Sequence, residues 1–238
     1  MSNYKIKDRQ LSEDFVLPVE KGGRVNPNLL HNWYFGNPVN RNGKTTYGQN
    51  SQPCIDRWRV NTDWAWIDVN DGYITIRGND VNGYGGIEQF LDDNTLDSIL
   101  GMTGTLSCYA RLYTDCTLGA IDVKSPTGDF QLYETTFTFA KTFFTLFKAK
   151  TPVEPSQPIA DIIAMKLELG DTQTLAHQDE EGNWVLNEIP DFGEQYAICC
   201  QYDKTSGEYL GLTPEAIGAR PDTWMPTASD VGRRLSKK

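Results

Sequence analysis

The chain has 238 residues, with 32 acidic and 22 basic side chains and a formal net charge of −10. This charge argues against binding to the phosphate backbone of nucleic acids, which needs clustered lysine and arginine. No apolar run approaches the roughly 20 residues that span a bilayer, and the polar start Met1–Gln10 predicts no secretory signal peptide.

The sequence predicts three parts. Residues 1–26 are polar and read as an N-terminal arm or linker. Residues 27–203 form a succession of short apolar-polar alternations cut by Gly, Pro, Asn and Asp, which is typical of an all-β sandwich; we expect about eight to ten strands. Residues 204–238 read as a connector in which Thr213–Arg220 and Thr227–Arg234 share the pattern Thr-x-x-x-[Ile/Val]-Gly-x-Arg.

The clearest element is a hairpin. Two alternating runs, Trp64–Asn70 and Tyr73–Arg77, flank Asp71-Gly72, a pair that favours a two-residue turn because both positions need positive φ. The register places on the core face Ala65, Ile67, Val69, Ile74 and Ile76. It places on the opposite face Trp64, Trp66, Asp68, Tyr73, Thr75 and Arg77, with Trp66 across from Arg77.

Further strands follow along the chain. In the run Thr105–Tyr113 the alternation predicts one core-facing set and one opposite set. The core-facing set is Leu106, Cys108, Ala110 and Leu112, and the opposite set is Ser107, Tyr109, Arg111 and Tyr113. Leu132–Lys150 predicts two strands or one long bent strand, and Ile162–Leu169 predicts a strand that Gly170 ends. We expect no long helix: Thr95–Leu100 is a short candidate, and Glu194–Gln201 could equally be a strand.

Cysteine and histidine usage points to structural roles. Five cysteines without a Cys-x-x-Cys pair predict reduced, mostly buried thiols in a protein made in a cytoplasm. His31, within an aromatic strand, and His177, in an acidic loop, lie too far apart in sequence for a zinc motif. Asp80–Gly83 begins like a calcium loop, but the later ligand spacing does not follow. We therefore expect no metal and no cofactor.

Catalytic signatures are also missing. The sequence has no Gly-x-Ser-x-Gly elbow and no phosphate-binding loop, so we expect a protein that is not an enzyme, with no catalytic residues. Two acidic clusters are expected to be solvated loops: Asp92, Asp93 and Asp97, and Asp179, Glu180 and Glu181. A glycosidase, which needs two carboxylates flanking one cleft, is the alternative.

The polar face of the hairpin is the candidate ligand site. Flat aromatic rings stack on sugar rings, and charged side chains can bond to hydroxyls. The candidate glycan-binding residues are Trp64, Trp66, Asp68, Tyr73 and Arg77. The alternative is that this face is a second buried side of the sandwich or packs on a neighbouring subunit.

Three stretches resemble a known family. Asn28–Tyr47 (NLLHNWYFGNPVNRNGKTTY) with Ile55–Trp58 (IDRW) resembles the opening of jelly-roll modules in tail-fibre and related tail proteins of phages and prophages. Thr105–Arg111 (TLSCYAR) is similar to their central strand. Their closing segment resembles Ala164–Gly170 with Thr174-Leu175 and Tyr196–Tyr202, and their spacers resemble residues 216–232.

The resemblance implies an antiparallel jelly-roll β-sandwich, like a carbohydrate-binding module, with an N-terminal arm and an extended C-terminal connector. It implies fold-defining roles, with Trp58 as a core anchor and Arg57 paired with Asp56 or Glu168. The full fold-defining set is Asn28, Asn32, Asp56, Arg57, Trp58 and Glu168.

The function implied is a non-enzymatic phage or prophage tail-fibre module that binds, or helps present binding to, host-surface carbohydrate. A purely structural collar or assembly module of the tail is the alternative, and a glycan-degrading tail enzyme is a further one. The expected partners are a host-cell glycan, other tail proteins and further copies of the chain, with a trimer favoured. The expected location is the virion tail, made in a bacterial cytoplasm and acting outside the cell.

Overall fold

The computed structural model describes residues 25–48, 54–61, 65–78, 86–119, 121–123, 128–140, 146–150, 154 and 156–206. The predicted arm lies outside the described residues except for its last two, and so do the connector repeats and the calcium-like run Asp80–Gly83. The chain divides into two units, residues 1–199 and 200–238. Of the second unit, the structure describes only residues 200–206.

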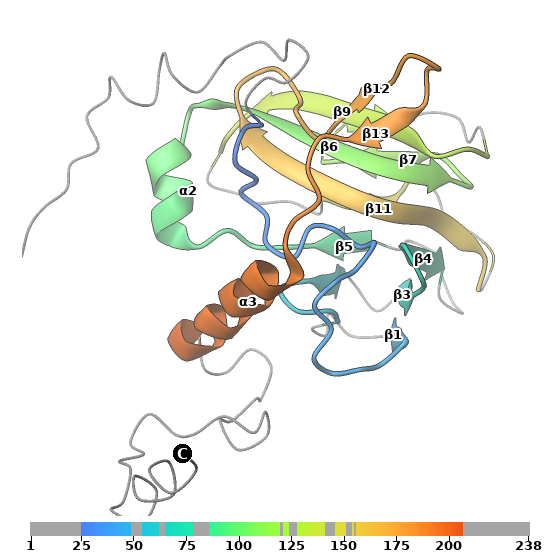
Figure 1. Cartoon of the computed structure of the whole chain (residues 1–238), viewed down its shortest axis with the longest axis horizontal. Coiled ribbons are helices and arrows are strands. Elements are labelled where there is room, and N and C mark those ends of the chain that lie inside the picture. Colours follow the sequence, from blue (N-terminus) through green and yellow to red (C-terminus); the bar gives the residue numbers. More distant parts are fainter. Residues whose placement is uncertain are drawn as a thin grey trace, which may run out of the picture. The chain divides into compact units, whose positions relative to one another are not determined.

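The described chain is almost entirely antiparallel β-structure (Figure 1). One sheet has, in spatial order, β1 (Thr46–Gly48), β3 (Ala65–Val69), β4 (Ile74–Gly78), β11 (Pro158–Leu169), β6 (Thr103–Leu112) and β9 (Gln131–Thr138). The other has β2 (Arg59–Asn61), β5 (Gly86–Glu88), β10 (Phe147–Ala149), β7 (Cys116–Leu118) and β8 (Ile121–Val123). A small third sheet pairs β12 (Ala176–Gln178) with β13 (Trp184–Leu186).

The strand order is that of a jelly roll. The eight consecutive strands β4 to β11 divide between the two sheets as β4-β11-β6-β9 and β5-β10-β7-β8. This is the arrangement that results when a long hairpin folds over on itself into two four-stranded sheets. Strands β1 and β3 extend the first sheet and β2 extends the second. The predicted jelly-roll sandwich is therefore confirmed, although short three-residue strands bring the described total to thirteen.

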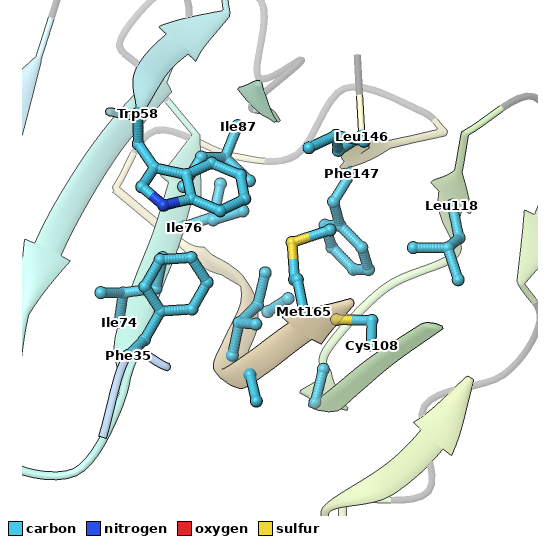
Figure 2. Close-up of a cluster of buried hydrophobic side chains, with 14 of the residues drawn as sticks. Phe35, Trp58, Ile74, Ile76, Ile87, Cys108, Leu118, Leu146, Phe147 and Met165 are labelled. Carbon is cyan, nitrogen blue, oxygen red and sulfur yellow. The ribbon is translucent and has the colours of Figure 1, made fainter. Parts of the chain in front are cut away.

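The core lies between the two sheets, and the residues that the predicted register turns toward it are buried there. Ala65, Ile67, Ile74 and Ile76 are fully buried, and Val69 packs partly buried against them. The four predicted core positions of β6 are likewise inaccessible: Leu106, Cys108, Ala110 and Leu112. From the opposite sheet Ile87, Leu118 and Phe147 point into the same space (Figure 2). The stretch Leu132–Lys150 supplies two strands, β9 and β10, which lie in different sheets.

The helices correct one expectation. Helix α2 (Asp93–Ile99) matches the short candidate and begins after Asp92, whose carboxylate accepts from Thr95 N at 3.0 Å. Helix α3 (Phe192–Ser206) is 15 residues long, so the prediction of no long helix was wrong. Its start is set locally, since Asp191 accepts from Glu194 N. The uninterrupted apolar run Tyr196–Cys200 covers all sides of the helix, so no one-sided apolar pattern indicates a helix here.

The segment 28–35 takes the place of a strand beside β11. Strand β4 pairs with β11 only as far as Ile162. Beyond it, Leu29 N donates to Leu167 O at 2.8 Å and Phe35 N donates to Ile163 O at 2.7 Å. The Asn28 side chain bridges further, donating to Met165 O and accepting from Leu167 N. His31 is therefore not in a regular strand, contrary to prediction, because side-chain and irregular backbone bonds replace the ladder.

Most of the predicted fold-defining residues form buried polar contacts. Asn32 is 2 % exposed, donates to Val39 O and Asp56 O, and its own carbonyl accepts from the Trp58 indole at 2.8 Å. Trp58, 1 % exposed, is a core anchor as predicted. Asp56 binds Arg41, and Glu168 contacts Lys166 and Thr174. The pairing expected for Arg57 stays a prediction.

All five cysteines are free, and four of them are buried. Burial raises the pKa of both Cys54 and Cys116 to about 12, so these thiols stay protonated and unreactive at neutral pH. Among the residues that the structure describes, no three His, Cys, Asp or Glu side chains come together as a metal site. None of the described helices is long and apolar enough to cross a membrane.

Candidate functional site

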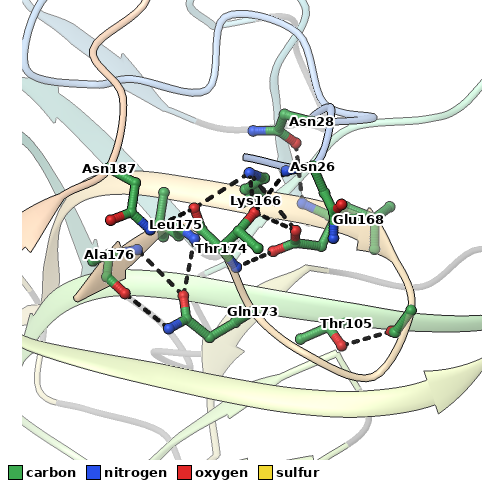
Figure 3. Close-up of polar contacts among 12 residues, drawn as sticks. Asn26, Asn28, Thr105, Lys166, Glu168, Gln173, Thr174, Leu175, Ala176 and Asn187 are labelled. Carbon is green, nitrogen blue, oxygen red and sulfur yellow. Dashed lines mark hydrogen bonds and ion pairs between the residues drawn. The ribbon is translucent and has the colours of Figure 1, made fainter. Parts of the chain in front are cut away.

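The outer face of the six-stranded sheet, opposite the core, has a covered half and an open half. In the covered half, Lys166 and Glu168 are buried beneath the loop that follows β11 (Figure 3). Lys166 donates to Thr174 Oγ1 at 2.6 Å, and Thr174 N donates to Glu168 Oε1 at 2.7 Å. Tyr109 lies at the border of the two halves, with its hydroxyl 3.4 Å from Trp184 O.

The open half, which we call the outer polar face, consists of half-buried or exposed residues. They come from strands β3, β4, β6 and β11, from the residues directly before β4 and after β6, and from the loop before β9. Only Asp161 among them is buried. Its members are Trp66, Asp68, Tyr73, Thr75, Arg77, Tyr109, Arg111, Tyr113, Phe130 and Asp161.

At one end of this face, β3 and β4 place an arginine between a ring and a carboxylate. Trp66 and Arg77 are paired across the hairpin, as predicted. The Arg77 guanidinium lies 5.9 Å from the centroid of the Trp66 ring. It also forms a two-pronged ion pair with Asp68, in which Nη2 donates to Oδ1 at 2.9 Å and Nε donates to Oδ2. Arg77 is therefore fixed in one orientation beside the indole.

The charges of this pair reinforce each other. Partial burial acts to raise the pKa of Asp68, but hydrogen bonds from Arg77 and Thr46 and the charge of Arg77 outweigh it, so the pKa lies below its usual value. Conversely, the hydrogen bond to Asp68 raises the pKa of Arg77. Both groups are ionised throughout the physiological range.

A glycine on the neighbouring strand leaves space for the Trp66 indole. Gly48 on the edge strand β1 pairs with Trp66. A Cβ added at Gly48 would lie 2.2 to 2.6 Å from three atoms of the Trp66 ring system. The indole therefore lies directly over the glycine backbone, a contact that any larger residue would prevent.

At the other end of the face, Asp161 of β11 is the centre of a second arginine site. It is only 2 % exposed. Thr75 Oγ1 donates to one carboxylate oxygen at 2.6 Å, and Tyr113 OH donates to the other at 2.8 Å. Arg111 donates to that second oxygen from both Nε (3.1 Å) and Nη2 (2.5 Å). Asp161 thus holds side chains from two neighbouring strands.

Aromatic rings surround this second arginine. The Arg111 guanidinium lies 4.9 Å from the Phe130 centroid and 5.5 Å from that of Tyr113. Tyr73 and Tyr109 each pack against Phe130, with centroid separations of 6.2 and 5.8 Å. The two ends of the face therefore repeat one design, a carboxylate that holds an arginine beside aromatic rings.

Four of the five predicted site residues lie on this face. Trp66, Asp68, Tyr73 and Arg77 are all half-buried, and none lies beneath the opposite sheet. Trp64 lies outside the described residues. The structure brings Trp66, Asp68 and Arg77 together, whereas Tyr73 belongs to the Phe130 cluster at the other end.

Two members of the face were missed from the sequence. Asp161 stands as a single charge in the apolar run 159–165, a signal for a buried residue with a specific partner. Phe130 precedes β9 and carries no periodic signal of its own. The alternation predicts Arg111 and Tyr113 on the polar side of their strand, but only long-range strand pairing connects them to the hairpin.

The two acidic clusters predicted from the sequence and His177 make contacts that belong to local structure. Asp92 caps α2, and Asp179 accepts from Glu181 N and Asn183 N in the turn between β12 and β13. His177 is exposed on β12, where its Nδ1 lies 2.5 Å from Asn187 Oδ1. These contacts assign the residues to turns, caps and the small sheet.

Comparison with known proteins finds distant similarity in structure. No protein-family model and no curated protein matches the sequence. Among solved structures, the CBM22-1 xylan-binding domain from Paenibacillus barcinonensis Xyn10C is similar over 62% of this chain and 97% of that domain, at 9% sequence identity and a TM-score of 0.34. A similarity this distant carries no argument about function.

Proposed function

We propose that this chain is a non-enzymatic carbohydrate-binding module and that the outer polar face is its glycan site. The observation that supports the proposal is the repeated arrangement of an arginine held by a carboxylate beside aromatic rings, at both ends of one open sheet face. Such fixed groups bind a ligand without losing much conformational entropy.

The chemistry of the face suits a hydroxylated ligand. Rings such as Trp66 and Tyr113 offer flat apolar surfaces for the C–H faces of sugars. The guanidinium groups of Arg77 and Arg111 offer N–H donors that hydroxyl oxygens accept. Because Asp68 and Asp161 balance the two arginines, the face carries no excess charge that would demand a charged ligand.

The same contacts oppose hydrolysis by this face. A glycosidase needs a protonated carboxylic acid to protonate the leaving group. The depressed pKa of Asp68 keeps that group ionised. Asp161 is buried and already accepts hydrogen bonds from three side chains. Neither carboxylate on the face is therefore placed to act as the acid.

We further propose that the module serves in a phage or prophage tail, presenting its glycan site to the host surface as a homo-oligomer. The support is the resemblance of residues 28–47 and 55–58 to tail jelly-roll modules. Several copies would multiply weak sugar contacts into useful avidity. Mass determination in solution tests the oligomer, and antibody labelling of virions tests the location.

Two matched tyrosines provide the test of the glycan site. Tyr113 on the outer polar face and Tyr196 on α3 are both 41% exposed. Retention on immobilised polysaccharides and on bacterial cells is measured for the unmodified chain, Tyr113→Ala, Trp66→Ala and Tyr196→Ala. We expect Tyr113→Ala and Trp66→Ala to lose retention and Tyr196→Ala to keep it.

Other outcomes decide against the proposal. No retention on any polysaccharide or cell would favour a purely structural tail module. Release of new reducing ends from the polysaccharides would favour a glycan-degrading enzyme. Equal losses in all three variants would show that the outer polar face is not the specific site.

A further inference from the structure

A small pocket lies away from the outer polar face. Its cavity volume is about 150 Å³. It is lined by Asn28, Leu29 and His31, by Arg57, and by residues between the end of β5 and the first turn of α2. The lining residues that matter for binding are Leu29, His31, Arg57, Phe90 and Asp92.

Hydrogen bonds among the lining residues and with Gln89 behind them hold the walls of this pocket. Gln89, 1 % exposed, accepts from His31 N at 2.7 Å and donates back to His31 O at 2.8 Å. The Asp92 carboxylate accepts from both Thr95 N and Thr95 Oγ1. Arg57 adopts φ of 73°, a conformation unfavourable for a side chain of this kind, between the buried residues Asp56 and Trp58. The pocket is therefore preformed.

An aromatic ring is exposed beside these polar groups. Phe90 is 42% exposed, and the Arg59 guanidinium lies 5.1 Å from its centroid. Arg59 itself lies 3.8 Å from Glu88. An exposed phenylalanine held next to convergent polar side chains is a common feature of binding sites.

The polar groups of the pocket both donate and accept. Burial and the charge of Arg57 lower the pKa of His31, although Asp92 acts to raise it, so the imidazole is neutral at pH 7. A neutral imidazole has one N–H donor and one acceptor nitrogen. Arg57 supplies donors and Asp92 supplies acceptors. Hydroxyl groups, which donate and accept at once, match this set.

We propose that this pocket is a second carbohydrate site, which holds one neutral sugar ring against Phe90 with its hydroxyls toward His31, Arg57 and Asp92. The ligand is neutral because one cation and one anion share the lining, so an anionic sugar would face Asp92. It is a single ring because the cavity, at about 150 Å³, is smaller than the roughly 300–1,000 Å³ of sites for larger ligands. The site is independent of the outer polar face.

The chain offers an internal control for the test, because it has only two histidines. His31 lines the pocket, and His177 is exposed on β12. The full chain is titrated with the methyl glycosides of glucose, galactose, mannose and N-acetylglucosamine, and the imidazole resonances of both histidines are followed by NMR. A His177→Gln variant lacks the resonances of His177 and so shows which imidazole resonances belong to each histidine. We expect at least one glycoside to shift the His31 resonances saturably and to leave those of His177 unmoved.

Two variants separate this site from the other. Phe90→Ala, at an exposed position, should weaken the His31 response about fivefold, the contribution of one stacked ring. Trp66→Ala should leave the response unchanged, whether or not the outer polar face binds glycans. The proposal is overturned if no glycoside shifts His31, if His177 shifts in parallel, or if Phe90→Ala has no effect. A response that Trp66→Ala abolishes would assign binding to the outer polar face alone.

Discussion

At the scale of single residues, the contact between Gly48 and the Trp66 indole is the most sensitive point of the outer polar face. Gly48→Ala would place a methyl group 2.2 Å from the Trp66 ring and force the indole away from its position beside Arg77. We expect weaker glycan retention, with the folded structure kept because the core faces of β1 and β3 are untouched. Affinity chromatography on the retaining polysaccharide measures the loss.

The control for this substitution is a double-mutant cycle. If Gly48→Ala acts only by moving the indole, it should have no further effect in a Trp66→Ala background. Additive losses from the two substitutions would contradict the contact that we assign to Gly48. Circular dichroism of each variant checks that the sheet remains.

Asp161 gives a second prediction at this scale. Asp161→Asn keeps the size of the side chain but removes the charge that holds Arg111, and it turns one acceptor into a donor facing its neighbours. We expect a loss of about 1–3 kcal/mol in the free energy of unfolding, measured by denaturant titration. Tyr113→Phe removes only one partly exposed hydroxyl donor, so it should lower the free energy of unfolding by less than Asp161→Asn does. The opposite ranking would show that Asp161 is not the organising group.

At the scale of elements, the covered half of the sheet depends on a buried charge pair. Lys166 and Glu168, 2 % and 0 % exposed, lie two residues apart on β11, and Thr174 contacts both. Removing one partner leaves the other charge buried, so Glu168→Leu should lower stability by about 3–5 kcal/mol. Lys166→Met combined with Glu168→Leu should recover part of that loss. A double variant no more stable than Glu168→Leu alone would contradict this.

The same pair predicts a pH dependence. Burial raises the pKa of Glu168 above its ordinary 4.5, while Lys166 opposes the rise. A raised pKa stabilises the folded state below the ordinary pKa, and this stability is lost as pH rises through the folded-state value. Lys166→Met removes the opposing charge, so its stability should fall more steeply than that of the unmodified chain above pH 4.5. Denaturant titrations from acid to neutral pH compare the slopes; parallel profiles would contradict the assignment.

Which elements could be predicted depended on how local their signals are. The hairpin β3–β4 was predicted in full, with its register, because a turn pair and two alternating runs lie within 14 residues of sequence. Helix α3 was not, because its apolar residues lack a helical period. The segment 28–35 beside β11 could not be foreseen, because its partners on that strand lie 128 to 139 residues away in the sequence.

At the scale of the whole molecule, the jelly-roll crossings explain why half of the candidate site was predictable. Trp66, Asp68 and Arg77 share one hairpin, so their face follows from alternation alone. Asp161 and Arg111 join them only because β11 lies between β4 and β6, a pairing of strands distant in sequence. No local pattern carries that information, although the resemblance to jelly-roll modules implied the architecture that creates it.

Net charge gives the last prediction. The whole chain carries −10, whereas the outer polar face pairs two arginines with two aspartates. A neutral polysaccharide should therefore bind with an affinity that changes little with salt. At about 0.01 M salt, charges act over about 30 Å, so the negative charge of the rest of the molecule should repel an acidic polysaccharide. At about 1 M salt, charges act over only about 3 Å, and this repulsion should be weaker. Binding assays across this range should show retention on the acidic polymer rising with salt. Tight binding to it at low salt, lost as salt is added, would instead require a basic surface that the proposed face does not contain.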